Sequence, residues 1–202
     1  FVGAIDGGGA PAILIELLRT IGSAEQKPKC NVGFFWIDAE ESIDWVWNDN
    51  RALLGSQEFC KKLSADGTMK RVKAFVLLDL MGSKNVKFDK AGDSTSQLID
   101  LIAKAGQEMG IGECMFQFPT QQAIDYYRQN KLPWGIKDDH LNFKNYGVPS
   151  VLLIDFQNRI PPHLQNLGQG QQPTVDPDYE QWWHTPDDNL AAMDASSLAI
   201  AG

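Results

Sequence analysis

The sequence predicts an α/β protein, a three-layer sandwich in which helices flank a mixed, mostly parallel central sheet. Short continuous apolar runs bounded by turn residues indicate strands that are covered on both faces. These runs alternate with amphipathic stretches of helical period, an order typical of a parallel sheet. The chain has 202 residues, of which 43% are hydrophobic and 22% charged. That length and composition suit one domain, residues 1–202, with a sizeable core.

The first predicted elements alternate between strand and helix. "FVGAID" indicates the end of a buried strand, so we expect further residues, and any targeting signal, to precede Phe1. "GGGAPAILIELLRTI" begins with a glycine-rich turn and continues with apolar residues at helical spacing. "NVGFFWI", residues 31–37, is a continuous apolar run that predicts a second buried strand.

The rest of the chain continues this alternation without internal repeats. Further strands are predicted at residues 71–82, 113–118 and 148–156, and further helices at 57–63, 95–110, 138–147 and 193–202. Gly110 is a suitable stop for the helix that precedes it. Residues 158–181 are rich in Pro, Gly and Gln and have no usable period, which predicts a functional or flexible loop.

Composition excludes several classes of function. Lys and Arg number 18 against 26 Asp and Glu, a net charge of -8, and nucleic-acid binding needs clustered Lys and Arg. No apolar run has the length of a membrane span. The three cysteines, Cys30, Cys60 and Cys114, are scattered, which argues against a disulfide framework or a thiolate zinc site.

Acidic residues follow three of the apolar runs immediately. Asp6, the pair Glu40 and Glu41, and Asp79 occupy these positions. Because ligands of such sheets bind beyond the carboxyl ends of the strands, we expect these acids to converge at one edge. Crowded carboxylates repel one another unless a cation lies among them. His184, in "QWWHTPDDN", would complete an Asp, Glu and His set with an open fourth position, as in catalytic zinc sites.

The adjacency of Glu40 and Glu41 suggests that the two carboxylates have different roles. Neighbouring side chains at a strand end point in different directions, so one carboxylate can bind metal while the other acts as a general acid or base. Tryptophans lie within six residues of these acids, of Asp138 or of His184, and would form an aromatic wall. They are Trp36, Trp45, Trp47, Trp134, Trp182 and Trp183.

Structural roles are the simpler interpretation for several of these residues. Trp36, inside a predicted strand, is expected to fill the core, whereas Trp183 beside His184 is expected to be functional. Asp79 taken alone could cap a helix. The remaining polar candidates are expected to be structural or exposed: His140 a second-shell or capping residue, His163 an exposed loop residue, and Asp187 and Asp188 caps of the final helical region.

Six segments together resemble a known family. They are "FVGAID", "DAEES", "VLLDLMGS", "KDDHLNF", "GVPSVLLID" and "WWHTPDDN". Their order and approximate spacing, over nearly the whole chain, are similar to those of animal-type glutaminyl cyclases, which are glutaminyl-peptide cyclotransferases related to the M28 zinc aminopeptidases. The resemblance implies a zinc-exopeptidase-like catalytic domain, here without its N-terminal strands.

The resemblance also implies an activity and a setting for it. The N-terminal Gln of peptides or proteins would be converted to pyroglutamate with release of ammonia, by an enzyme with one Zn²⁺ per chain. We expect a monomer that is exported to the secretory pathway or the periplasm. Leu152 stands where many animal members have a histidine, which suggests a bacterial-type member.

Residue roles follow from the matched motifs. The resemblance makes Asp6, Glu41 and His184 the zinc ligands and Glu40 the catalytic acid and base. Asp79 and Asp138 match buried acids that hydrogen-bond near the reacting amide and amine. Trp183 and Trp47 match the aromatic residues that flank the substrate, and Trp134 is a further candidate. Trp45 remains an alternative to Trp47, because the chain carries one extra residue between Glu41 and Gly55.

Two other functions stay open on the sequence alone. In an M28-type aminopeptidase with two metals, Asp6 would bridge the ions and Asp79 would bind the second. The doubled acid Asp138 and Asp139, and Trp183 directly before His184, favour a cyclase. A non-catalytic, peptide-binding relative is the third hypothesis, although every proposed ligand and acid is present.

Overall fold

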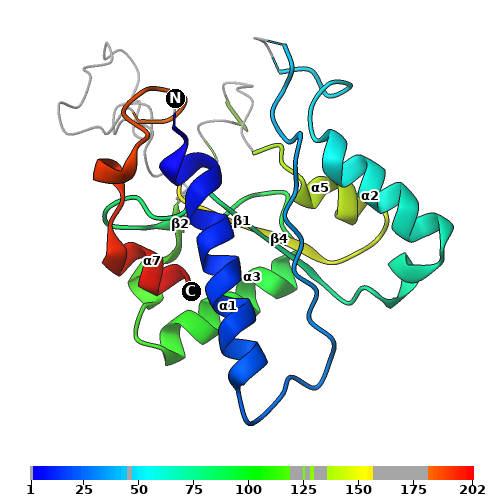
Figure 1. The fold of residues 1–202 in the computed structure, drawn as a ribbon, viewed down its shortest axis with the longest axis horizontal. Helices are drawn as coiled ribbons and strands as arrows, with labels where there is room; N and C mark the ends of the chain where they lie inside the picture. The colour runs from blue at the N-terminus through cyan, green and yellow to red at the C-terminus, as the bar shows by residue number, and fades with distance from the viewer. Residues whose placement is uncertain (1, 45–46, 119–124, 126–127, 130–135, 157–181) are drawn as a thin grey trace.

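The computed structural model describes residues 2–44, 47–118, 125, 128–129, 136–156 and 182–202 (Figure 1). The predicted loop at 158–181, together with Trp45, Trp134 and His163, lies outside these residues. The α-helices are α1 (Ala10–Ser23), α2 (Leu54–Ala65), α3 (Ser96–Glu108), α5 (His140–Asn145) and α7 (Ala195–Ala201). The strands are β1 (Phe75–Asp79), β2 (Phe88–Asp89), β3 (Met115–Phe118) and β4 (Ser150–Ile154). Shorter helical turns are η1 (Ala4–Gly9), η2 (Thr68–Arg71), η3 (Gly112–Cys114) and η5 (Leu190–Ala192).

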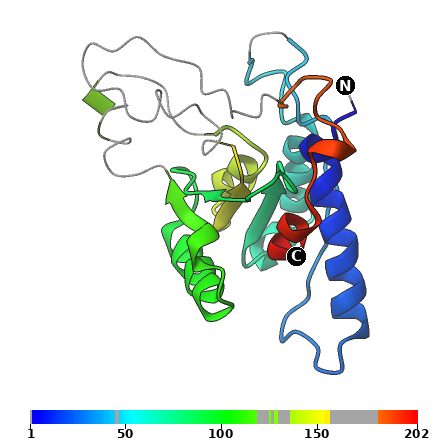
Figure 2. The same cartoon turned by 90° about the vertical axis from the view of Figure 1, so that its left-hand side faces the viewer.

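The described strands form two parallel pairs. Strand β1 pairs with β4 in a register that sets Phe75 opposite Ser150 and Asp79 opposite Ile154. Strand β2 pairs with β3. Figure 2 shows α1 and α7 on one side of the β1–β4 pair and α3 on the other. Helices thus cover both sides of parallel strands, and the predicted α/β class is confirmed.

Local sequence accounts for the helix boundaries. Pro11 lies in the first turn of α1, where its missing N–H costs nothing. Gly110 adopts φ 78° just after α3, a left-handed conformation that glycine accepts readily. The Asp194 side chain accepts a 2.8 Å hydrogen bond from the Ser197 amide and so caps α7. The predicted helices therefore form where the sequence placed them.

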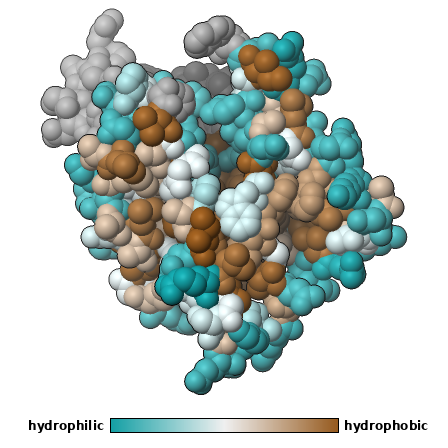
Figure 3. All heavy atoms as spheres, in the orientation of Figure 1, coloured by the Kyte–Doolittle hydropathy of each residue, from teal (hydrophilic) through white to brown (hydrophobic). Residues whose placement is uncertain are grey.

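Apolar side chains from the two sides of the sheet form the core. One cluster joins Ile13 of α1 to Met81, Val86, Phe88 and Met115. A second joins Ile5 to Leu152, Ile154 and Trp182. Apolar residues also remain exposed on the face in Figure 3. Ile15 and Leu18 of α1 are among the exposed apolar residues of the described chain. Among the described helices, none is both long and apolar enough to span a membrane.

The predicted strand at residues 31–37 is wrong. The segment has no regular secondary structure, and its residues are exposed or half-buried. It packs through Phe35, whose ring lies 4.0 Å from that of Phe59 on α2. A strand needs a hydrogen-bonded neighbour, and none of the described strands pairs with this segment. Trp36 is accordingly 44% exposed, so the expectation that it fills the core is also wrong.

The start of the chain differs from prediction in a similar way. Ala4 and Ile5 are buried as expected, but residues 4–9 form the π-helical turn η1 rather than the end of a strand. Gly7 reverses the backbone with φ 98°. The amides of Ala4, Ile5 and Asp6 donate to Asp188 and not to a neighbouring strand. The turn leads directly into α1 and leaves Asp6 at its bend.

Candidate active site

Acidic side chains from distant parts of the chain converge at one end of the β1–β4 pair. Asp6 comes from the turn η1, and Asp79 is the last residue of β1. Glu40 and Glu41 lie on the irregular segment before α2, and Asp138 lies just before α5. Electrostatic interactions link Glu40 to Glu41, Asp79 and Asp6. The predicted convergence therefore occurs, although of these acids only Asp79 belongs to a strand.

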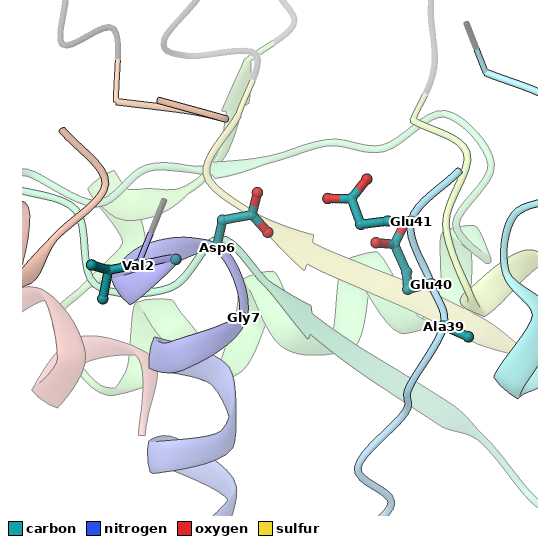
Figure 4. A pocket seen from close by; sticks show the side chains of 7 residues that line it. Val2, Asp6, Gly7, Ala39, Glu40 and Glu41 are labelled. Carbon is teal, nitrogen blue, oxygen red and sulfur yellow. The ribbon is translucent and has the colours of Figure 1, made fainter. Parts of the chain in front are cut away.

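Three potential metal ligands lie together at the edge of this group of acids. One ligand atom each from Asp6, Glu41 and His184 lies within 4.8 Å of the other two. His184 Nε2 is 2.8 Å from Glu41 Oε1 and 3.2 Å from Asp6 Oδ2. Figure 4 shows the carboxylates of Asp6 and Glu41 pointing towards the same space. Two carboxylate oxygens and an imidazole nitrogen form a suitable ligand set for zinc.

The environment of Asp6 also suits a cation. Asp6 Oδ2 is buried and accepts no hydrogen bond from the described residues, although His184 Nε2 lies near it. A buried carboxylate oxygen without a donor is costly unless it is protonated or bound to a cation. Burial, followed by the charge of Glu41, raises the Asp6 pKa to about 6. A bound cation would relieve this repulsion and restore the carboxylate.

A cleft of about 420 Å³ opens beside these ligands. Its lining residues are Val2, Gly3, Asp6, Gly7, Ala39, Glu40 and Glu41. The glycines and alanine leave room between the two acidic segments, and the Glu40 carboxylate lies beside that of Glu41 (Figure 4). A small group held in this cleft would therefore contact the metal ligands on one side and Glu40 on the other.

Three acids near the metal ligands, Glu40, Asp79 and Asp138, have raised pKa values that suit them to proton transfer. Burial, and then the charges of Glu41 and Asp79, raise the Glu40 pKa to about 8. Burial, and then the charge of Asp6, raise the Asp79 pKa to about 7. The Asp138 pKa is raised well above its usual value, again chiefly by burial and then by Asp79. Such shifts mark functional-site candidates, because these groups can exchange protons near neutral pH.

The backbone around Glu40 is held tightly against the start of α2. The amides of Leu53 and Leu54 donate to the carbonyls of Glu40 and Ala39, at 2.7 and 2.9 Å. Gly55 lies so close to this segment that an added Cβ would sit 2.1 Å from the Asp38 carbonyl oxygen. Ala39 adopts φ 51°, an uncommon conformation for a residue with a side chain. These contacts fix the backbone of the segment that carries Glu40.

A buried polar network connects α2 to the segment that carries Asp138. The Ser56 hydroxyl hydrogen-bonds to Asp139 Oδ1, and Asn142 Nδ2 donates to Ser56 Oγ at 2.7 Å. The Asp139 amide donates to Asp138 Oδ1 at 2.6 Å, which leaves Asp138 Oδ2 buried without a hydrogen bond from the described residues. Burial raises the Asp139 pKa to about 6, against the opposing effect of the Ser56 hydrogen bond. Neither Ser56 nor Asn142 stands out in the sequence as a site residue.

The predicted aromatic residues are only partly described. Trp183 is exposed and stacks on His184 with ring centroids 4.1 Å apart, and its ring also meets Phe156 edge-on. The Trp47 indole donates a 2.7 Å hydrogen bond to Asp49. Trp182 is buried in the core rather than facing the cleft. Trp45 and Trp134 fall outside the described residues.

The expectation that Asp187 and Asp188 cap the final helical region is wrong. Asp188 is fully buried and binds the amides of Ile5 and Asp6, whereas Asn189 and Asp194 cap the final helical elements. Asp187 is exposed and caps neither of them. His140 is buried in the first turn of α5 but forms no capping hydrogen bond. These roles depend on contacts between distant segments, which no local motif reveals.

The sequence profile of Peptidase family M28 matches residues 2–202. The chain belongs to this family.

Within the family, the similar proteins include glutaminyl cyclases. A glutaminyl-peptide cyclotransferase of Dictyostelium discoideum is 23% identical over 98% of this chain. A glutaminyl cyclase from an Acidobacteriales bacterium matches 100% of this chain with 30% identity and a TM-score of 0.75. A Zn-dependent exopeptidase from Parabacteroides distasonis, at 22% identity over 99% of the chain, shares the fold with a TM-score of 0.68. The resemblance to glutaminyl cyclases is confirmed.

These matches cover only part of the length of each relative. This M28 chain spans 51% of the Dictyostelium protein and 59% of the Acidobacteriales chain.

Proposed function

We propose that this M28 protein is a zinc-dependent glutaminyl-peptide cyclotransferase, which converts the N-terminal Gln of peptides or proteins to pyroglutamate and releases ammonia. The observation that carries the proposal is the set of ligand atoms from Asp6, Glu41 and His184 within 4.8 Å, with the carboxylate of Glu40 beside it. Similarity to named glutaminyl cyclases along the same residues supports it. In this proposal residues 1–202 form one catalytic domain, and the protein is exported to the secretory pathway or the periplasm, as the resemblance implies.

We assign one Zn²⁺ per chain to Asp6, Glu41 and His184. Three protein ligands leave a fourth position open for substrate, as catalytic zinc sites require. Zinc bound there would supply Lewis acidity, which polarises the γ-carboxamide of the N-terminal Gln. The α-amine of the same residue is then the nucleophile, and intramolecular attack has a high effective molarity. The protein's main task is to hold the bent conformer of the substrate.

Glu40 is assigned the proton transfers. Its carboxylate would take a proton from the attacking amine and deliver it to the departing ammonia. General acid–base groups work best with a pKa near the operating pH, and burial with acidic neighbours raises that of Glu40. A cation on the adjacent ligands would bring this pKa down towards neutrality, because positive charge favours the carboxylate.

Asp138 and Asp79 are assigned to orienting the reacting groups. Both acids lie near Glu40, and the charge of Asp79 raises the pKa of Asp138 and that of Glu40. Crowded acids of this kind retain protons, so they can donate as well as accept hydrogen bonds. Asp138 Oδ2, which has no hydrogen bond from the described residues, is the atom suited to receive the substrate amine.

The substrate side chain is assigned to an aromatic surface. Trp183 beside His184 and Trp47 would flank it, and Trp45 and Trp134 remain candidates. Flat aromatic walls can exclude water around a small uncharged amide.

A two-metal aminopeptidase is the alternative. It is favoured by the M28 family and by the charge interaction of Asp79 with Asp6. Against it, the metal-binding group found in the described part of the chain contains Asp6, Glu41 and His184 but not Asp79.

The full-length purified protein should be assayed on Gln-β-naphthylamide and Leu-β-naphthylamide while its zinc content is measured. Ring closure on the Gln substrate with one zinc per chain would support the cyclase. Release of naphthylamine from the Leu substrate with two metals per chain would identify the peptidase instead. Binding of peptides without turnover and without zinc would point to a non-catalytic relative.

A further inference from the structure

Asp188 receives hydrogen bonds from three consecutive amides at the opposite end of the chain. The Ile5 amide donates to Asp188 Oδ1 at 2.7 Å, and the Asp6 amide donates to Asp188 Oδ2 at 3.0 Å. The Ala4 amide donates to the Asp188 carbonyl at 3.4 Å. Asp188 is 0% exposed. A buried carboxylate that binds two successive amides fixes both the position and the direction of that backbone.

The same residue closes the turn that follows the one carrying His184. The Asp188 amide donates to the Thr185 carbonyl, and the Thr185 amide donates to the Trp182 carbonyl, at 3.1 and 3.0 Å. His184 lies within this turn and adopts φ 55°, a left-handed conformation that the surrounding contacts must maintain. Asp188 therefore touches the backbone of one proposed metal ligand and closes the turn that directly follows the one carrying another.

The backbone at Asp6 needs such support. Asp6 and Gly7 depart from helical geometry inside η1, with φ, ψ of -84°, 95° and 98°, -19°. On the other side of the turn, an added Cβ at Gly9 would lie 1.9 Å from the Met81 carbonyl, so the end of η1 packs closely against the segment that follows β1. The Asp188 carboxylate holds the remaining, N-terminal side of the turn.

We propose that Asp188 is a positioning residue for the metal centre, which pre-arranges Asp6 and His184 before a cation binds. It touches neither substrate nor metal in this role, and acts through the backbone of Asp6 and the turn around His184. Its buried negative charge, which interacts with Asp6, also favours a cation nearby. The inference rests on the zinc site assigned under the proposed function.

The test is the zinc affinity of Asp188→Asn, measured by competition with a chromophoric chelator. Asparagine has the same shape but turns an NH₂ group towards one of the two amides. We expect the dissociation constant for zinc to rise by about 10- to 100-fold, the usual effect of losing a group that orients a ligand. The Co²⁺ absorption spectrum should change as well, because the ligand geometry becomes less regular.

Asp187→Asn is the matched control. It makes the same change of charge one residue away, on an exposed side chain, and should leave the zinc affinity unchanged. Far-UV circular dichroism with EDTA present shows whether each metal-free variant is folded. If Asp188→Asn does not fold, Asp188→Glu takes its place, since it keeps the charge but displaces the carboxylate; weaker zinc binding is again expected.

Three results would overturn the inference: unchanged zinc affinity in the folded Asp188→Asn protein, an equal loss in Asp187→Asn, or unchanged affinity in Asp188→Glu where that variant is needed. Failure of the unmodified protein to bind zinc at all would instead remove the proposed function.

Discussion

The hydroxyl of Ser56 hydrogen-bonds to the carboxylate of Asp139 across 83 positions of sequence. Ser56 lies on the first turn of α2, and the amides at the start of this helix, from Leu53 and Leu54, donate to the Glu40 and Ala39 carbonyls. Asp139 follows Asp138 and donates its amide to that residue's carboxylate. This contact joins the segment that carries the proposed acid and base to the segment that carries the proposed orienting acid.

Replacing Ser56 by alanine should destabilise the protein. Asp139 and Asn142 would both lose a buried partner, and an unsatisfied buried polar group costs about 1–3 kcal/mol. Urea unfolding should show this loss for Ser56→Ala. Ser64→Ala, at an exposed site on the same helix, is the control and should be neutral. Equal stabilities of the two variants would show that the buried network contributes nothing.

Glu40→Gln should abolish most cyclisation while zinc remains bound. A glutamine cannot exchange the proton, and general acid–base catalysis contributes about 10²- to 10⁴-fold. Zinc affinity should not fall, because Glu40 is not part of the ligand set. Steady-state turnover of a Gln substrate and zinc content should be measured together. Glu58→Gln, exposed on α2, is the control; an active Glu40→Gln enzyme would refute the role given to Glu40.

Asp49→Ala should weaken substrate binding more than turnover. The Asp49 carboxylate accepts a hydrogen bond from the Trp47 indole and contacts Lys137 Nζ at 2.8 Å. Without it, Trp47 loses its fixed orientation, and we expect KM to rise roughly two- to tenfold, as for one lost hydrogen bond, with kcat retained. Asp100→Ala, exposed on α3, is the control. A fall in kcat at constant KM would contradict this role.

His140 should make stability depend on acidic pH. Burial, and then the charge of Lys144, lower its pKa to about 4, whereas the unfolded chain titrates near pH 6.5. Below pH 6.5 the unfolded state therefore takes up the proton first. The free energy of unfolding should fall by about 1.4 kcal/mol per pH unit until pH 4 is reached.

The comparison with His140→Leu isolates this effect. Acids with raised pKa values, such as Asp139, gain protons in the folded state and oppose the trend over part of the same range. The difference in unfolding free energy between the two proteins should therefore be followed from pH 7.5 to pH 4. As the pH falls, the leucine variant should become more stable relative to the unmodified protein. Parallel curves would show that His140 has the same pKa in the folded and unfolded states.

Zinc removal should lower the thermal midpoint. Binding to the folded state alone adds about 2.7 kcal/mol when free zinc is 100 times its dissociation constant. For a chain of this length that corresponds to about 5–10 °C. Differential scanning calorimetry with zinc or with EDTA measures the shift. His184→Ala should reduce it strongly, and an identical midpoint with and without zinc would argue against a site in the folded protein.

The sequence by itself determined the helices and the central parallel pair. The helix at residues 96–108 follows from its one-sided apolar period and from Gly110, and β1 and β4 follow from their continuous apolar runs. These signals are local, because each residue's neighbours in sequence are also its neighbours in the element. The candidate ligands were predictable for a related reason: Asp6, Glu41 and His184 stand in recognisable motifs and meet within 4.8 Å.

Only the tertiary structure decided which segments support these ligands. Residues 31–37 have a strand-like composition, but no described strand pairs with them, so the sequence pattern could not show that Trp36 would be exposed. Asp188 resembled a local helix cap, yet its carboxylate binds amides 183 and 182 positions away. A carboxylate has the same hydrogen-bonding capacity in either setting, and the donors it meets depend on how distant segments pack. The residue types needed for the proposed chemistry can thus be recognised from local motifs. Their geometry depends on contacts that form only when both ends of the chain come together.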